Sequence, residues 1–349
     1  MKITKYPQSC LLVETKGKKI LIDPGALKYK EEYFDVWNNV DIIFITHKHA
    51  DHCNTEILEK INNNIKIYST KEVLKCINDE DKTVAYAIEK KVDEIKALTE
   101  AYIQTLDNGG RVFYIGAGTS GRMAFIDAAE IMPTYGIPEG VVEGIMCGGL
   151  SALKRAKEAA EDQAEEGTRD LKEKNFTSKD MLIGIAASGR TPYVMNAMEY
   201  AKSLGATVGS ICCVSNAQMS KIADYPVEVV VGQEVVLGST RMKSGTAQKL
   251  ILNMISTTVF VRSGRTYKNC LLNTTPTTEK TYIRTIRAIS NEAQISFELA
   301  KEFFDNADRN SILAMAMIKT GYCKEEAQDF LRKHNGRLRE GLKSIGINE

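Results

Sequence analysis

Three of the chain's four histidines lie within residues 46–52, which read THKHADH. They follow a strand-like run, residues 40–46, and alternate residues that leave a strand point the same way. Imidazole nitrogens and carboxylates are ligands that zinc prefers. The stretch is therefore a candidate zinc site, and zinc would bring hydrolytic chemistry. Its potential ligands are His47, His49, Asp51 and His52.

Two glycine-rich turns, each after an apolar strand-like run, have the features of a phosphate site. The first is GAGTSGR, residues 116–122, and the second is SGRTP, residues 188–192, with Pro192 suited to a helix's first turn. Each offers free backbone N–H groups, a positive helix end and small hydroxyls, which suit a phosphate monoester. Two such turns at the carboxyl ends of neighbouring strands could converge on one ligand.

The first turn also matches the GxGxxG pattern of dinucleotide sites, with Gly116, Gly118 and Gly121. A dinucleotide site requires an acidic residue at the end of the next strand, about 20 residues on. Glu143 lies within the next predicted strand and not at its end. We therefore expect a phosphate site. The alternatives are a nicotinamide dinucleotide, or glycines that serve only a tight turn.

The elements that must position these turns alternate along the middle of the chain. Such alternation predicts an α/β fold, a doubly wound parallel sheet with helices on both faces. Before it, a capping-box signature at residues 69–72 opens a helical pattern that continues as a long helix to Tyr102. The strands are predicted at residues 111–115, 140–147, 181–186, 207–214 and 227–231.

Three segments are expected along the chain. Residues 1–68 contain short strands and the histidine stretch, residues 69–288 form the α/β domain of the phosphate turns with its leading helices, and residues 289–349 form a small helical domain. The length of the chain is consistent with these three segments, because 349 residues are enough for two or three domains.

Composition excludes several classes of protein. A net charge of +1 gives no electrostatic reason to expect nucleic acid or an anionic membrane as partner. No apolar run approaches the roughly 20 residues that span a bilayer, and the N-terminus lacks the apolar core of a signal peptide. Eight scattered cysteines without CxxC spacing fit reduced thiols, so we expect a cytoplasmic protein.

Four motifs resemble those of the N-acetylmuramic acid 6-phosphate etherases, which have the sugar isomerase (SIS) fold. The resemblance begins near residue 69, runs to the C-terminus in the family's motif order, and shares its last motif with glucokinase regulatory protein. The motifs are GAGTSGR, DAAEIMPTYG at residues 127–136, GIAASGRTPY at residues 184–193 and GSTRMKSGTAQK at residues 238–249.

The resemblance implies a carbon–oxygen lyase of amino sugar metabolism and peptidoglycan recycling. It would remove D-lactate from C3 of N-acetylmuramic acid 6-phosphate by elimination, and water would then add back to give N-acetylglucosamine 6-phosphate. In the ring-opened sugar the C2 proton is acidified by the neighbouring aldehyde, so a base can take it while an acid protonates the departing ether oxygen. Two carboxylates can do both without a metal.

By motif, Glu130 corresponds to the family's proton donor to the lactate oxygen, and Glu161 to its second catalytic glutamate, the proton acceptor and water activator. Without the family, Glu161 would not stand out among 45 acidic residues. Glu130 has local support as well. It is expected to end an apolar helix, residues 123–129, where an idle carboxylate would be costly if buried.

The remaining site residues are expected to bind the substrate's anionic groups. Ser120 and Ser188 are the first choices for the phosphate. The loop at residues 239–246 adds counter-charges for phosphate or the lactate carboxylate, although a solvated loop ahead of a helix capped at Thr246 is the alternative. Supporting residues are Thr119, Gly189 and Thr191, and the loop supplies Ser239, Arg241 and Lys243.

Members of the family are homodimers with sites near the subunit contact, so the resemblance implies a homodimer without a cofactor. The chain differs from the family in its N-terminal segment. Residues 1–68, including LIDPG at residues 21–25, resemble the start of a metallo-β-lactamase-fold hydrolase. Gln8 stands where many such hydrolases have a histidine, and the one later histidine, His334, lies in a helix-end sequence. We therefore expect no functional metal.

Two other classes of function remain open. A sugar-phosphate-binding regulator of the SIS fold would keep the phosphate turns but would not need Glu130 or Glu161. A zinc hydrolase would use residues 46–52 and would lose activity to a chelator.

Overall fold

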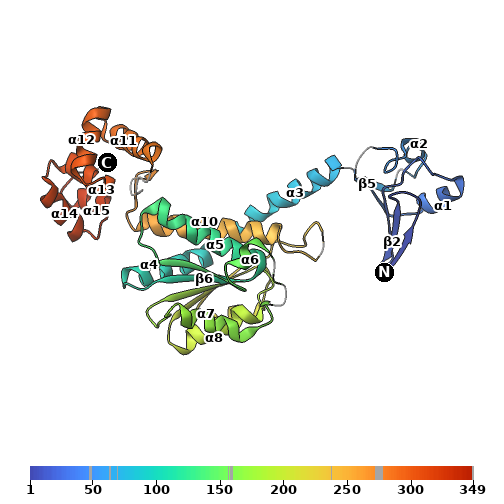
Figure 1. The fold of residues 1–349 in the computed structure, drawn as a ribbon, viewed down its shortest axis with the longest axis horizontal. Coiled ribbons are helices and arrows are strands. Elements are labelled where there is room, and N and C mark those ends of the chain that lie inside the picture. Colours follow the sequence, from blue (N-terminus) through green and yellow to red (C-terminus); the bar gives the residue numbers. More distant parts are fainter. Residues whose placement is uncertain are drawn as a thin grey trace. The chain divides into compact units, whose positions relative to one another are not determined.

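The chain divides into two compact units, Met1–Lys82 and Thr83–Glu349. The computed structural model describes residues 1–46, 49–62, 64–68, 70–155, 157, 160–236, 238–271 and 278–347 (Figure 1). The predicted boundaries after residues 68 and 288 stay predictions. The second of them falls within helix α11 (Glu279–Ala293).

The first unit contains a five-stranded mixed sheet with its own small core. The strand order is β1-β2-β3-β4-β5, antiparallel from β1 to β3 and parallel from β3 to β5. Trp37, Leu21 and Ile43 are buried at its centre. The strands are β1 (Lys2–Lys5), β2 (Leu11–Thr15), β3 (Lys18–Ile22), β4 (Ile42–Phe44) and β5 (Lys66–Tyr68), and the short helices are η1 (Glu31–Tyr33), α1 (Phe34–Trp37) and α2 (Thr55–Leu58).

The helical pattern after residue 69 forms two helices, α3 (Thr70–Glu89) and α4 (Val92–Asp107). The prediction of one long helix to Tyr102 is therefore wrong. At Lys91 the backbone leaves helical geometry, with φ −123° and ψ 16°, and its N–H donates to the carbonyl of Ile88, three residues back, at 2.8 Å. Ser69, which opens the predicted capping box, lies outside the described residues.

The second unit is built on a parallel sheet of order β10-β9-β8-β6-β7, which confirms the predicted doubly wound α/β fold. Buried residues gather in a separate cluster on each face. Helices α4, α5 and α10 cover one face, and α7 and α8 cover the other (Figure 1). The strands are β6 (Val112–Gly116), β7 (Val142–Met146), β8 (Met181–Ile185), β9 (Thr207–Cys212) and β10 (Tyr225–Glu228).

The connecting elements complete the unit. The helices are α5 (Gly118–Tyr135), α6 (Ser151–Lys154), α7 (Ala164–Glu173), α8 (Pro192–Ser203), α9 (Gln218–Ile222) and α10 (Lys243–Arg262), followed by a ladder of β11 (Thr266–Tyr267) and β12 (Cys270–Leu271). After α11 come α12 (Phe297–Asn306), α13 (Ser311–Thr320), α14 (Lys324–Lys333) and α15 (Leu338–Ser344), which share a core around Phe304 and Met315. Among the described residues, no helix is both long and apolar enough to cross a membrane.

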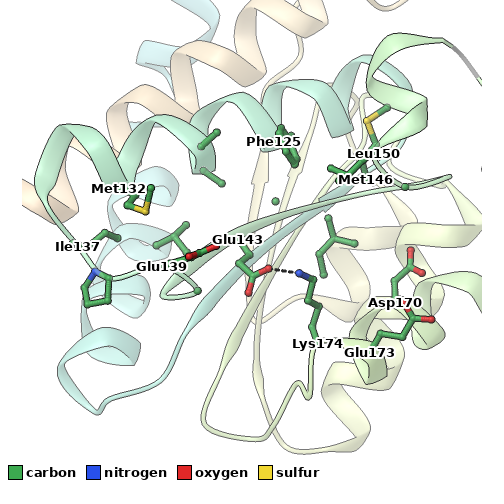
Figure 2. Close-up of a pocket in the computed structure, with 18 residues that line it drawn as sticks. Phe125, Met132, Ile137, Glu139, Glu143, Met146, Leu150, Asp170, Glu173 and Lys174 are labelled. Carbon is green, nitrogen blue, oxygen red and sulfur yellow. Dashed lines mark hydrogen bonds and ion pairs between the residues drawn. The ribbon is translucent and has the colours of Figure 1, made fainter. Parts of the chain in front are cut away.

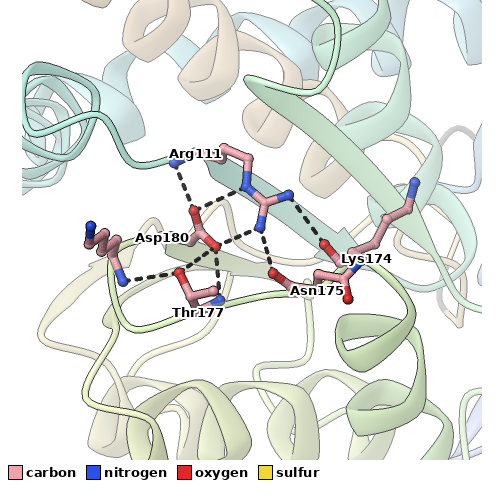
Figure 3. Close-up of polar contacts among 6 residues, drawn as sticks. Arg111, Lys174, Asn175, Thr177 and Asp180 are labelled. Atoms are coloured by element: carbon pink, nitrogen blue, oxygen red, sulfur yellow. Dashed lines mark hydrogen bonds and ion pairs between the residues drawn. The ribbon is translucent and has the colours of Figure 1, made fainter.

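At the amino edge of the sheet, an ion pair between the half-buried Arg111 and the buried Asp180 joins the starts of β6 and β8 (Figure 3). The Asp180 carboxylate accepts from the backbone N–H of Arg111 at 2.9 Å and from its guanidinium at 2.8 Å. It also accepts from the backbone N–H of Thr177 at 2.8 Å. Burial alone would raise the pKa of Asp180, but these hydrogen bonds outweigh it and hold the pKa below its usual value. The carboxyl edge, where the sequence predicts the site, lies at the opposite end of these strands.

Candidate functional site

The first phosphate turn joins β6 to α5. Ala117, at the N-cap, is extended and has no polar side chain with which to cap the helix, and Gly118 has a positive φ of 54°. Thr119 and Ser120 lie in the first helical turn, with Ser120 buried. The amides of this turn are helix-start donors, which favour an anion.

Gly121 lets α5 start close against the strand that precedes it. Its N–H donates to the carbonyl of Ala117 at 3.1 Å, and a Cβ at this position would lie 2.5 Å from the carbonyl oxygen of Gly116. A side chain would therefore push the helix start away from the strand. The glycine spacing in this turn serves close packing of a helix on a strand end.

The second turn joins β8 to α8. Gly189 has φ +62°, and its backbone donates to Ala186 and accepts from Met219. Ser188 is exposed, and Thr191 is the N-cap before Pro192 at the first helical position. Strands β6 and β8 are direct neighbours in the sheet. The two turns therefore start from adjacent strand ends at the same edge.

The third loop leads into α10, which begins at Lys243. The alternative of a helix capped at Thr246 is wrong, because α10 begins three residues before Thr246 and the Glu234 carboxylate caps it there. It accepts from the backbone N–H groups of Lys243 at 2.9 Å and Ser244 at 3.1 Å. These two helix-start amides thus already hold an anion and are not available to a ligand. Ser239 and Arg241 are exposed, whereas Lys243 is only 3% exposed.

The start of α10 packs directly against the first turn. Gly245 is buried, and a Cβ placed on it would lie 3.1 Å from Cγ2 of Thr119. The N–H of Gly245 donates to the carbonyl of Thr240 at 3.2 Å. The loop that carries Arg241 is therefore folded onto the residues that begin α5.

Glu161 lies in an exposed turn ahead of α7. Its backbone carbonyl accepts from the N–H of Tyr193 in the first turn of α8, at 3.2 Å. The pKa of the Cys147 thiol, just past β7, is raised to about 11 by burial and by the charges of Asp170, Glu161 and Glu166. Glu161 is thus held beside the second phosphate turn and near the end of β7.

A cavity of about 630 Å³ opens on this side of the sheet. Asp170 belongs to its wall, and Tyr193 donates from its hydroxyl to this carboxylate at 2.6 Å. The segment around Glu161 contributes to the wall as well. The other lining residues include Gly148, Lys157, Ala160, Gln163, Glu166 and Arg169.

Glu130 lies well inside α5, on an exposed face. The predicted helix end at Ala129 is wrong, because α5 continues to Tyr135 and includes Pro133. The Glu130 side chain is exposed to solvent. The cost of burying a carboxylate therefore gives no support for a catalytic role of Glu130. Glu130 follows Thr119 by eleven positions, which corresponds to about 16 Å along the helix axis.

Two charged residues that the sequence analysis did not single out join α5 to α10. Lys249 donates to the buried Asp127 carboxylate at 3.0 Å, and Ser256 donates to the same oxygen at 3.4 Å. Both Asp127 and Lys249 lie inside the motifs quoted for the family. The sequence did contain a signal for this pair, because Asp127 stands among apolar residues of the predicted helix. A buried charge normally has a partner of opposite charge.

An open groove of about 620 Å³ runs between α5 and β7 (Figure 2). Phe125 and Met132 on α5 line it together with Leu150, which is 70% exposed. Glu143 and Lys174 form an ion pair across its floor. Ala129 also lines this groove, so the helix face that adjoins Glu130 is largely apolar.

The histidine stretch of the first unit is engaged in contacts with its own chain. His52 lies 2.9 Å from Asp23 through Nδ1, and through Nε2 it lies 2.9 Å from Ser9 and 3.3 Å from Asp51. His47 lies outside the described residues. Within the part of the chain that the structure describes, no three histidine, cysteine or acidic side chains are grouped as metal ligands. That no metal functions at residues 46–52 stays a prediction, and no step of the reaction is assigned to a metal.

His334, the fourth histidine, is the C-cap residue of α14, as its helix-end sequence indicates. Its ring nitrogens contact the carbonyl of Phe330 at 2.9 Å and the hydroxyl of Ser344 at 3.0 Å. It has a structural role at this helix end.

Three family models match parts of the chain. The glucokinase regulatory protein N-terminal SIS domain matches residues 92–202, the SIS domain matches residues 161–257, and the beta-lactamase superfamily domain matches residues 2–131. A solved phosphoheptose isomerase from Neisseria gonorrhoeae is similar at 18% identity with a TM-score of 0.42, over 54% of this chain and 97% of that chain.

Curated relatives are far more similar. An N-acetylmuramic acid 6-phosphate etherase from Clostridioides difficile is 46% identical over 78% of this chain and 90% of its own length. The enzyme of the same name from Clostridium botulinum is 44% identical over 84% of this chain and 98% of its own length. A third, from Actinobacillus pleuropneumoniae, is 47% identical over 80% of this chain and 92% of its own length.

Proposed function

The chain belongs to the N-acetylmuramic acid 6-phosphate etherase family, and from that premise we propose that it releases D-lactate from N-acetylmuramic acid 6-phosphate. The product is N-acetylglucosamine 6-phosphate, formed by elimination and then hydration. Relatives of 44–47% identity that match over nearly their whole length carry this name. The observation that carries the proposal is the pair of phosphate turns at adjacent strand ends, with the Glu161 backbone bonded to the second.

The phosphate group is the part of the substrate that the paired turns suit best. A dianionic monoester accepts hydrogen bonds only, and the turns offer backbone N–H groups and hydroxyls. We assign Thr119 and Ser120 from the first turn to the phosphate. The second turn contributes Ser188, Gly189 and Thr191.

The third loop adds positive charge to that of Arg122 and Arg190 in the two turns. Arg241 is exposed on the loop that leads into α10, whose Gly245 packs against Thr119, so we assign its guanidinium to a carboxylate or a phosphate near the first turn. Ser239 lies on the same exposed stretch. Lys243 is buried at the start of α10, so it is less accessible to a ligand than Arg241.

The chemistry requires two proton transfers. A base takes the C2 proton of the ring-opened sugar, the C3–O bond breaks, and an acid protonates the lactate oxygen as it leaves. The resulting unsaturated aldehyde then gains water at C3. We assign the base to Glu161, which is tied to the second phosphate turn, and the acid to Glu130.

We also propose a homodimer in which each site takes Glu130 from the partner. Glu130 lies about 16 Å along α5 from the first phosphate turn of its own chain, farther than one hexose phosphate extends. The α5 side of the groove beside Glu130 is apolar, with Phe125, Met132 and the exposed Leu150 opposite it, and suits a second copy of α5. A two-fold contact would bring each Glu130 toward the other copy's turns.

A cytoplasmic location is part of the proposal. All eight cysteines lie in the described part of the chain, and none of them forms a disulfide. Unpaired thiols are typical of a reducing compartment.

A sugar-phosphate-binding regulator is the second candidate, because residues 92–202 match the glucokinase regulatory protein model. Such a protein would bind N-acetylglucosamine 6-phosphate without turning over the etherified sugar. Glu130 and Glu161 would then have no role.

Lactate release from N-acetylmuramic acid 6-phosphate separates these functions. We expect turnover by the wild type, unaffected by EDTA, and a loss of at least 100-fold in Glu130→Gln. Glu199→Gln, an exposed carboxylate on α8, is the matched control and should keep full activity. Sugar-phosphate binding without turnover would favour the regulator, and chelator-sensitive turnover would favour a metal enzyme.

A further inference from the structure

Gln248 is a buried amide without a hydrogen-bond partner. It lies on α10 and is 1% exposed, and neither Nε2 nor Oε1 has a partner among the described residues. Buried polar groups in proteins are nearly always hydrogen-bonded, because an unsatisfied group is destabilising. A donor and an acceptor left open on one side chain require an explanation.

The neighbours of Gln248 on α10 locate its side chain. Four residues earlier, the carbonyl of Ser244 lies 3.7 Å from the Cys213 thiol that donates to it, just past the end of β9. Three residues earlier, Gly245 packs against Thr119 at the start of α5. Residues at these spacings share a helix face, so Gln248 lies one turn below both contacts.

The direction of the side chain follows from helix geometry. Long side chains on a helix lean toward its N-terminus, which here is the end that faces the phosphate turns. The N–H of Cys213 donates to the carbonyl of Ala187 at 3.1 Å, and Ala187 directly precedes Ser188. The Gln248 amide is therefore directed to the carboxyl edge of the sheet, between the first turn and the second.

We propose that Gln248 is a sugar-binding residue whose amide receives a hydroxyl group of the sugar phosphate. A hydroxyl both donates and accepts, so it satisfies Oε1 and Nε2 together. A phosphate dianion only accepts and would leave Oε1 unpaired. The assignment rests on the proposed function, because it requires a sugar phosphate between the two turns.

Gln248→Met tests the assignment, since it keeps the length of the side chain and removes both polar atoms. Loss of two unsatisfied buried groups should raise the melting temperature of the ligand-free protein by a few degrees. At the same time kcat/KM for lactate release should fall 10- to 100-fold, because a buried hydroxyl of the substrate is left unpaired. If Gln248 had only a structural role, the more stable variant would keep its kcat/KM.

Ser311→Ala is the matched control. Its hydroxyl is also buried and unpartnered, but it lies on α13, in the C-terminal helices. We expect a melting temperature at or above that of the wild type and unchanged kcat/KM. If Gln248→Met fails to fold, Gln248→Asn keeps the amide but draws it back by one methylene, and it should raise KM at least fivefold.

Binding measurements keep this inference separable from the proposed function. Inorganic phosphate and N-acetylglucosamine 6-phosphate are each titrated against the wild type and Gln248→Met, with the shift in melting temperature as readout. The sugar phosphate shift should shrink in the variant while the phosphate shift stays. That result would support the role of Gln248 even if the wild type released no lactate. A kcat/KM within twofold of wild type, or an undiminished sugar phosphate shift, would overturn it.

Discussion

The backbone carbonyl of Glu161 accepts a hydrogen bond from the backbone N–H of Tyr193 at 3.2 Å. The bond joins an exposed turn to the first turn of α8, which follows Ser188 and Thr191. Tyr193 is itself fixed, since it is buried and its hydroxyl donates to Asp170. The position of the Glu161 carboxylate is therefore coupled to the second phosphate turn through the backbone, and a side-chain substitution at Glu161 leaves that coupling intact.

Glu161→Gln should consequently lose lactate release by 100-fold or more while its melting temperature and its KM change little. The carboxylate is exposed, and the backbone bond to Tyr193 does not depend on the side chain. General base catalysis typically contributes 100- to 10,000-fold. Asp162→Asn, the next exposed carboxylate, is the control and should be fully active. Equal losses in the two variants would point to general charge effects instead.

Mixed dimers test whether Glu130 acts across a subunit contact. Two inactive variants, Glu130→Gln and Glu161→Gln, are refolded together or co-expressed with different tags and purified as heterodimers. If each site takes Glu130 from its partner, one of the two sites has both glutamates, and about half of the wild-type lactate release should return. The separate homodimers serve as blanks. Should the glutamates act within one chain, the heterodimer stays inactive, because each copy lacks one of them.

The periodicity of the middle segment was sufficient to predict the parallel sheet and the two turns, because alternating strands and helices specify a doubly wound fold. The start of α10 was mispredicted, since its cap is Glu234, nine residues before Lys243 and not adjacent to the helix. The end of the helix that carries Glu130 was also mispredicted. The apolar run stops at Ala129, whereas α5 continues through Pro133 to Tyr135.

The sequence alone could not predict the site residues whose roles depend on tertiary contacts. Asp127 and Lys249 are separated by 121 intervening residues, and only the fold shows that they meet. Gln248 is one of several polar residues in α10, and its unpaired amide becomes evident only when its neighbours are known. Local spacing predicts turns and helices, but it does not predict which polar groups remain unpartnered.

Asp180→Asn should destabilise the second unit by about 2 kcal/mol at neutral pH, since it breaks a largely buried ion pair with Arg111. The folded-state pKa of Asp180 is lowered, so its contribution is present above the unfolded pKa of about 3.9 and is lost as pH falls through the folded value. Urea unfolding of both proteins at a series of pH values should show a gap that closes only below about pH 4. Asp329→Asn, in an exposed pair with Arg332, should show no such gap.

Glu234→Ala should weaken the start of α10, because two helix-start N–H groups lose their acceptor. We expect a loss of about 1 kcal/mol in the free energy of unfolding, the usual effect of removing a helix cap. The loop with Arg241 should also become less ordered, so KM should rise severalfold. Truncation of the neighbouring exposed Gln233 to alanine is the comparison and should leave both quantities unchanged. A variant as stable as the wild type would show that the carboxylate does not act as the cap.

Two glycines near the first turn should respond differently to alanine. In Gly121→Ala the new Cβ meets the backbone carbonyl of Gly116 at 2.5 Å, and neither backbone can yield without moving α5 off its strand. We expect a loss of several kcal/mol or no folded protein. In Gly245→Ala the Cβ lies 3.1 Å from a methyl group of Thr119, which can shift by a few tenths of an ångström.

Because alanine favours a helix over glycine by about 1 kcal/mol, Gly245→Ala should melt at or above the wild-type temperature. The displaced Thr119 should nevertheless raise the KM for the sugar phosphate, since its backbone and hydroxyl are assigned to the phosphate. Thermal unfolding and steady-state lactate release measure the two effects on one sample. An unchanged KM together with a stable fold would mean that Thr119 does not contact the substrate, and the phosphate would then depend on Ser120 alone in the first turn.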